Sequence, residues 1–296
     1  MTKAMKTKIY LLGVITVLLV WAGRPLAASQ DWKLLFSLQA DKTAGAFAHP
    51  TGLFVDAQAE RYYVTDSGHN RLVSFDKDGK LLHAFTAGGG LEKPIAMAKR
   101  EEGRLLVLEK GKAALTEIDI KSRAVVPHTL EDRGEPLYPQ RLKAGGGSFS
   151  IIDKASGDIV ILDQGLAVNR RLHCPDCAAG YADLSVKGDM VYALPLLGAE
   201  IHLFDKTDAL IKKIPLTPAP EFPISLALAA DGGFLVLERH GGTVAHYHAD
   251  GRLLTRHLGP GQREGSLSYP VEIQVDPWGR VCVVDEGNGR VSVFQP

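Results

Sequence analysis

Two cysteines separated by two residues form the most reactive string of the chain, His173-Cys174-Pro175-Asp176-Cys177. Attachment of a c-type haem needs a histidine directly after the second cysteine, and Ala178 stands there instead. A structural zinc site needs four ligands, and only three are local. Thioredoxin-like chemistry expects the pair to open a helix, whereas the surrounding pattern is one of strands. We therefore predict a disulfide between Cys174 and Cys177 that closes a small loop, with a redox or docking role as the alternative.

The chain has 10 histidines, which raises the question of a zinc-dependent enzyme. His246 and His248 alternate along one expected strand, but two ligands alone do not make a metal site. No Ser–His–Asp order and no pair of carboxylates stands out. Residue types alone therefore give an enzyme little support, and we predict no catalytic residue, no metal ligand and no cofactor.

The elements that must position these residues are indicated by an internal repeat. An acidic residue closes an apolar run at regular intervals, and these acids are Asp66, Glu109, Asp153, Glu238 and Asp285. The spacing is about 44 residues once Pro195 is counted as a missing member of the series. Six units of this size suit six four-stranded propeller blades.

The clearest unit runs from His49 to Phe85 and has a period of two, not 3.6. Turn-forming residues such as Asp76-Lys77-Asp78-Gly79 separate its apolar runs. Five units open at a proline, where a missing N–H costs least because the ladder has not begun: Pro50, Pro94, Pro139, Pro223 and Pro270. These patterns predict an all-β fold, a six-bladed β-propeller of four-stranded antiparallel blades.

The sixth unit reaches Pro296 after only three expected strands. A matching fourth strand is found near the other end of the chain, where Asp31-Trp32-Lys33-Leu34-Leu35 repeats the pattern of the fourth strands at 78–82 and 250–254. We expect Leu34–Leu38 to pair with Val291–Phe294, because this pairing closes the ring and covers two edges that would otherwise invite aggregation.

The first unit, with Pro50-x-Gly52-Leu53-x-Val55-Asp56 and Tyr63-Val64-x-Asp66-Ser67-Gly68-His69-Asn70-Arg71-Leu72, resembles an NHL repeat. The unit from Pro270 through Asp285 to Val291 resembles it nearly as well, and the other units are weaker. The resemblance implies a six-bladed propeller in which the strand-ending Asp caps the following turn. It implies no single activity, since the family includes RNA binders, protein-binding sensor domains, scaffolds and a few lyases and lactonase-like relatives.

Charged residues are expected along the central channel, to which the first strand of each blade contributes. The residue two past the opening proline is Gly52, Ala96, Arg141, Ser225 or Glu272, and Asp183 is the equivalent in the degenerate fourth unit. Arg141, Asp183 and Glu272 are therefore candidate ligand-binding residues for a small anion, a peptide carboxylate or a cation. The alternative is an internal Arg141–Asp183 bridge with Glu272 hydrated by channel water.

The N-terminal segment has the layout of a secretory signal peptide. Lys3, Lys6 and Lys8 precede an apolar run, and small residues ending at Ala28 follow it. We predict cleavage of residues 1–28, with an uncleaved membrane anchor as the alternative, and a single propeller domain over 31–296. Localisation would be periplasmic or extracellular. Removal of four basic residues leaves 30 basic against 34 acidic side chains, which disfavours nucleic-acid binding.

These observations favour an exported, non-enzymatic binding or scaffold protein that mediates protein–protein or small-ligand interactions in the cell envelope. Its partner would be an envelope or extracellular protein, a redox protein included. Contacts are expected on the long connections 87–92, 131–138, 217–222 and 259–268. The alternative is a metal-dependent lactonase- or lyase-like enzyme with calcium or zinc near Asp183 and Glu272.

Overall fold

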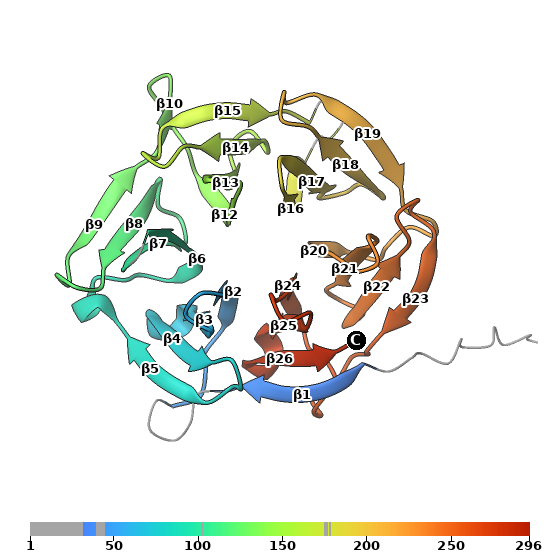
Figure 1. The fold of residues 1–296 in the computed structure, drawn as a ribbon, viewed down its shortest axis with the longest axis horizontal. Helices are drawn as coiled ribbons and strands as arrows, with labels where there is room; N and C mark the ends of the chain where they lie inside the picture. Colours follow the sequence, from blue (N-terminus) through green and yellow to red (C-terminus); the bar gives the residue numbers. More distant parts are fainter. Residues whose placement is uncertain (1–31, 40–44, 102, 175–176, 178) are drawn as a thin grey trace, which may run out of the picture.

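Six four-stranded antiparallel sheets stand around a central axis in the computed structural model (Figure 1). The structure describes residues 32–39, 45–101, 103–174, 177 and 179–296. The predicted six-bladed β-propeller is confirmed. The expected signal peptide, residues 1–28, lies outside the described residues. Among the described residues no helix is long and apolar enough to cross a membrane.

Each blade runs from an inner strand at the channel to an outer strand at the rim. The bounds, blade by blade, are as follows. Blade 1 has β2 (Pro50–Asp56), β3 (Arg61–Asp66), β4 (Arg71–Asp76) and β5 (Leu81–Phe85), and blade 2 has β6 (Pro94–Glu101), β7 (Arg104–Glu109), β8 (Ala114–Asp119) and β9 (Val125–Thr129). Blade 3 has β12 (Pro139–Gly145), β13 (Ser148–Asp153), β14 (Ile159–Leu162) and β15 (Val168–Leu172), and blade 4 has β16 (Tyr181–Lys187), β17 (Met190–Pro195), β18 (Glu200–Phe204) and β19 (Leu210–Pro215). Blade 5 has β20 (Pro223–Leu228), β21 (Phe234–Glu238), β22 (Thr243–Tyr247) and β23 (Leu253–His257), and blade 6 has β24 (Pro270–Val275), β25 (Val281–Asp285), β26 (Arg290–Gln295) and β1 (Lys33–Leu38). Short additions are the hairpin β10 (Glu131–Asp132) and β11 (Glu135–Pro136) and the 3₁₀ turns η1 (Ser67–His69), η2 (Ala87–Gly89) and η3 (Glu286–Asn288).

The ring is closed by β1, which pairs with β26 as expected (Figure 1). Leu34 lies opposite Phe294 and Leu38 lies opposite Val291. Trp32, just before the strand, stacks on His257 of blade 5 with ring centroids 4.2 Å apart. The N-terminal strand therefore supplies the outer strand of blade 6 and a contact to its neighbour.

The hydrophobic core is divided among the spaces between blades. Each of the six clusters of buried side chains combines residues of two neighbouring blades. For example, Tyr62 and Phe75 of blade 1 pack in one cluster with Val284 and Val291 of blade 6. Because each sheet buries both faces only against its neighbours, the blades stabilise one another.

Antiparallel pairing places the beginnings of all inner strands at one end of the channel, together with the ends of the second strands. We call this end the top face. The connections between blades arrive here too, which gathers the expected contact loops 87–92, 131–138, 217–222 and 259–268 on one side of the molecule.

Candidate functional site

The six residues predicted to face the channel share one position in their strands. In every blade a register shift follows the first residue of the inner strand, and the next paired residue is the predicted one: Gly52, Ala96, Arg141, Asp183, Ser225 or Glu272. The alignment made from the proline spacing therefore has the correct register, including the degenerate fourth unit.

Arg141 and Asp183 lie on adjacent blades and contact one another. The Asp183 side chain is fully buried, and one of its oxygens accepts hydrogen bonds from the Ser225 hydroxyl and from the Leu226 N–H, the latter at 3.0 Å. The Nε of Arg141 lies 3.8 Å from the other oxygen. The Arg141 guanidinium also donates to the Ala182 carbonyl oxygen at 3.1 Å. These contacts connect blades 3, 4 and 5.

The same kind of contact continues around the ring. The Ser225 hydroxyl accepts a hydrogen bond from the Ile273 N–H at 3.1 Å, and Glu272 accepts one from the Leu53 N–H at 3.0 Å. In blades 4, 5 and 6, the side chain of the channel residue thus accepts a hydrogen bond from the next blade. The donor is the backbone N–H of the residue directly after that blade's own channel residue. A backbone N–H at these interfaces would otherwise lack a partner, so the polar channel residues stabilise blade packing.

Glu272 also has a partner that sequence reasoning missed, because we expected this side chain either to bind a ligand or to be hydrated by channel water. The ammonium of Lys143, on the opposite blade, forms an ion pair with the Glu272 carboxylate. Burial lowers the pKa of Lys143, but the carboxylates of Glu272 and Asp183 outweigh it and hold that pKa above its usual value. Lys143 stands two residues after Arg141. Because side chains two residues apart lie on the same face of a strand, the sequence already placed Lys143 on the channel face.

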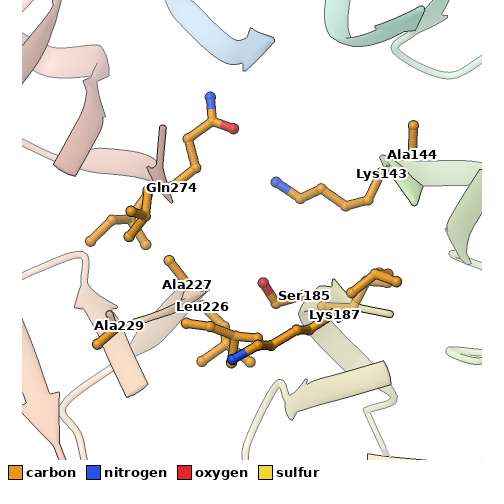
Figure 2. A pocket seen from close by; sticks show the side chains of 13 residues that line it. Lys143, Ala144, Ser185, Lys187, Leu226, Ala227, Ala229 and Gln274 are labelled. Atoms are coloured by element: carbon orange, nitrogen blue, oxygen red, sulfur yellow. The ribbon is translucent and has the colours of Figure 1, made fainter. Parts of the chain in front are cut away.

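A pocket of about 430 Å³ lies where the inner strands of blades 3 to 6 end (Figure 2). Figure 2 shows Lys143 and Gln274 reaching toward each other from opposite sides, with the Ser185 hydroxyl pointing into the same space. The Gln274 amide donates to the Leu53 carbonyl oxygen at 3.2 Å. Lys143 and Gln274 are thus engaged by the protein itself, and Lys187 is the other cationic side chain of the lining.

On the top face, the repeated strand-ending acids bind the incoming connections. Asp66 accepts a hydrogen bond from the Ala48 N–H at 2.8 Å, Glu238 from Glu221 at 2.7 Å, and Asp285 from Ser268 at 2.7 Å. Each donor lies two residues before the proline that opens the inner strand. The acids therefore act as structural caps, as the repeat resemblance implies.

The residue between each donor and the proline has a left-handed backbone. His49, Lys93, Phe222 and Tyr269 have φ values of 55°, 46°, 51° and 46°, and Gly180 takes this place in blade 4 with φ 68°. Such values are uncommon for residues other than glycine. The cap and the proline together fix this conformation, and the resulting side chains are exposed around the channel mouth, Phe222 at 68% and Tyr269 at 58%.

A hollow of about 860 Å³ occupies the top face and is lined by residues of blades 1, 2, 3, 5 and 6. Its lining contains six cationic side chains and one carboxylate, Glu286. The cations are Lys93, Lys110, Lys112, Arg141, Lys154 and Arg239, and we call this hollow the basic bowl.

Half of these cations have a carboxylate partner within the protein. Lys112 lies 2.9 Å from Glu109 and Arg239 lies 2.8 Å from Glu286, while Arg141 faces Asp183. The other three are Lys93, Lys110 and Lys154, and no carboxylate among the described residues lies within 4.0 Å of their ammonium groups. Their charge is available to a ligand.

The bowl had a signal in the sequence that we did not use. Lys110, Lys154 and Arg239 each directly follow a strand-ending acid, so the repeat places all three at one position of their blades. Its lining also includes the apolar side chains of Ile95, Ile224 and Val271. Cationic and apolar side chains in one hollow can bind an anionic group and bury part of its carrier.

The structure bonds Cys174 to Cys177, with Cα atoms 5.4 Å apart, at the outer part of the junction between blades 3 and 4. The bond lies between the outer strand β15 and the start of β16. The remaining cysteine, Cys282, is fully buried in blade 6, and burial raises the pKa of its thiol well above the usual value. We assign Cys282 to the core.

Comparisons with known proteins give a fold and no family. No protein-family profile matches the chain, and no curated protein matches its sequence. Solved structures do resemble it. They include a streptogramin B lyase (TM-score 0.64, 13% identity, 90% of this chain and 98% of that one) and the virginiamycin B lyase of Staphylococcus aureus with quinupristin (TM-score 0.63, 14%, 90% and 89%). Regucalcin, a calcium-binding protein of Agrobacterium tumefaciens, is a third (TM-score 0.61, 14%, 84% and 90%). At these identities the likeness shows that the chain shares a six-bladed propeller fold with them.

Proposed function

We propose that the protein is an exported, non-enzymatic binding platform that holds an acidic segment of a protein partner in the basic bowl. The observation that carries the proposal is the charge of the bowl: three of its six cations have no carboxylate partner among the described residues, in a chain with equal numbers of acidic and basic residues. A local concentration of one sign steers a partner of the other sign and sets its orientation.

Exposed aromatic side chains next to the bowl support a protein partner over a small anion. Tyr138 lines the bowl, and Tyr269 lies under the guanidinium of Arg239 at 5.8 Å. Phe222 packs beside His240 with ring centroids 4.4 Å apart and the ring planes tilted. Tyrosine and arginine are enriched among residues that carry binding energy at protein interfaces. Export rests on the N-terminal pattern, and a relationship to NHL repeats rests on the motifs of blades 1 and 6.

Charge reversal tests the proposal. The variant Lys93→Glu/Lys110→Glu/Lys154→Glu removes the unpaired cations of the bowl. The matched control is Lys80→Glu/Lys121→Glu/Lys206→Glu, which changes the net charge equally at exposed turns of the opposite face. Binding of fluorescent polyglutamate is measured against salt concentration. We expect the bowl variant to lose at least about tenfold in affinity and the control to keep wild-type affinity.

Equal loss in both variants would contradict the proposal, because net charge alone would then explain binding. Tighter binding of single-stranded DNA than of polyglutamate by the wild-type protein would also contradict it. Pull-down from an envelope fraction with the wild type and both variants then identifies the partner, which should be captured by the wild type and the control only.

The metal-dependent enzyme has weaker support. Lyases and regucalcin share the fold, which is an argument from architecture alone. A divalent ion at Asp183 and Glu272 would have to compete with Arg141 and Lys143 for the same carboxylates. We therefore place the function in the bowl.

A further inference from the structure

The disulfide between blades 3 and 4 lies beside a buried histidine. Cys174 follows β15 of blade 3, and His202 belongs to β18 of blade 4 (Figure 1). The Nδ1 of His202 lies 3.8 Å from the Sγ of Cys174. His202 is fully buried and Cys174 is 6% exposed, whereas Cys177 is only partly buried. One sulfur therefore faces the histidine, and the other is nearer to solvent.

The hydrogen bonds of His202 determine which nitrogen carries a proton. Its Nε2 lies 2.7 Å from a carboxylate oxygen of Glu200. A carboxylate only accepts, so Nε2 is the N–H, and Nδ1 carries the lone pair of the neutral ring. The Tyr181 hydroxyl lies 3.0 Å from Nδ1, and burial, with the charges of Asp158 and Glu200, raises the pKa of Tyr181. Tyr181 therefore remains a donor to Nδ1 while the ring is neutral, and this same nitrogen is the one beside the Cys174 sulfur.

This arrangement favours a thiolate at Cys174. A carboxylate next to a histidine stabilises the imidazolium, and an imidazolium next to a sulfur stabilises its thiolate. Lys213, 3.8 Å from Glu200, moderates the carboxylate charge but does not replace the contact with His202. The better leaving group in a disulfide is the sulfur whose thiolate is stabilised.

We propose that Cys174–Cys177 is a thiol–disulfide exchange site for a dithiol protein, with Cys177 as the attacked sulfur and Cys174 as the leaving thiolate held by His202. A partner thiolate attacks the Cys177 sulfur, the bond between the two cysteines breaks, and its electron pair stays on Cys174. As that thiolate forms, Nδ1 of His202 takes up a proton from water, and the resulting imidazolium shares this proton with the Cys174 thiolate. The second partner thiolate then attacks its own sulfur in the mixed disulfide and releases Cys177, which takes a proton from water. The partner dithiol is oxidised to a disulfide, and this pair is reduced by two electrons and two protons.

A purely structural disulfide would not need these neighbours. The loop it closes spans only two intervening residues, and cross-linking stabilises short loops least. His202 is fully buried beside the leaving sulfur, and its ring is held there by Glu200 and Tyr181. The exchange site is independent of the basic bowl, since it lies at the rim and shares none of its residues.

The test measures reduction of the purified protein by dithiothreitol, followed by the mass shift on alkylation, in wild type, His202→Gln and Glu200→Gln. The matched control is His173→Gln, because His173 is adjacent in sequence but exposed and bound to Asp158. We expect His202→Gln to slow reduction at least about tenfold and to shift the equilibrium toward the disulfide, and Glu200→Gln to act in the same direction. Equal rates in His202→Gln and His173→Gln would overturn the proposal.

A second measurement keeps the proposal testable if His202→Gln does not fold. The variant Cys177→Ser leaves Cys174 as a single thiol whose alkylation rate is followed against pH. A midpoint at least one unit below the value of about 8.5 for free cysteine is expected, and a midpoint at or above that value would overturn the assignment. Zinc is the other outcome to check. Stoichiometric zinc retained by the reduced wild-type protein would replace exchange by metal binding at Cys174, Cys177 and His202.

Discussion

Replacing Asp183 by alanine tests whether the channel residues stabilise blade packing or bind a ligand. The substitution removes the acceptor of the Leu226 N–H and of the Ser225 hydroxyl, and it leaves the partly buried Arg141 without its carboxylate. Loss of one partner of a buried ion pair costs about 3–5 kcal/mol. An unsatisfied buried N–H costs about 1–3 kcal/mol on its own, but the two effects share one side chain and do not add.

We therefore expect Asp183→Ala to lower the free energy of unfolding by about 3–5 kcal/mol. Asp183→Asn retains an acceptor oxygen of the same size and should lose less, about 1–3 kcal/mol. The matched control is Asp189→Ala, on the exposed turn of the same blade, which should stay within about 0.5 kcal/mol of the wild type. Equilibrium unfolding in urea, monitored by tryptophan fluorescence and by circular dichroism, measures all three.

The reasoning fails if Asp183→Ala is as stable as Asp189→Ala. A buried carboxylate whose removal is harmless would be one kept for a ligand, and the channel would again be the candidate site. An increase in stability on replacing Asp183 would lead to the same conclusion, because removing a strained or unpaired buried charge can stabilise a protein.

Three further predictions address closure, the channel and acid stability. Leu38→Ala, at a fully buried position of the closing strand, should destabilise the protein by about 2–5 kcal/mol, whereas Leu35→Ala at an exposed position of the same strand should have little effect in the same urea assay. A double-mutant cycle of Lys143→Met and Glu272→Gln should give a coupling energy of about 1–3 kcal/mol, and additive effects would argue against the ion pair across the channel. Burial raises the pKa of Asp153, but hydrogen bonds from Tyr138 and Ser156 outweigh it, so the net effect is a lowered pKa. Ionised Asp153 therefore stabilises the folded protein above about pH 4, and this stabilisation is lost as the pH falls through the pKa of the folded state. The melting temperature of the wild type should therefore fall more steeply than that of Asp153→Asn between about pH 4 and pH 2, and parallel curves would contradict this.

Sequence predicted the fold well because a propeller repeats local signals. The prolines that open the inner strands fixed the register of Arg141 and Glu272, since a strand has a period of two and an error of one residue would turn both side chains away. The closing strand was predictable from a five-residue pattern for the same reason. These features depend on short segments whose physics is local.

The contacts that define the sites depend on packing between blades. Lys143 reaches Glu272 only because the two blades face each other across a narrow channel, and no pairwise spacing indicates that distance. His202 stands 28 residues after Cys174 and meets it because the third strand of one blade packs against the exit of the previous one. Sequence reasoning identified the cysteines and missed the histidine that gives them a chemical role.

Departures from the repeat, more than the repeat itself, distinguish the two proposed sites. In blade 4, Pro195 stands in place of the strand-ending acid, and Gly180 occupies the position with the left-handed backbone. This blade therefore has no acidic cap and no side chain at that position of the channel mouth. The lining of the bowl accordingly comes from the other five blades, and cations follow the acids in blades 2, 3 and 5. The same blade carries His202 at its junction with the disulfide. A sequence that obeyed the repeat everywhere would give a symmetric ring without a directed charge, and locally inconsistent positions are where function is expected.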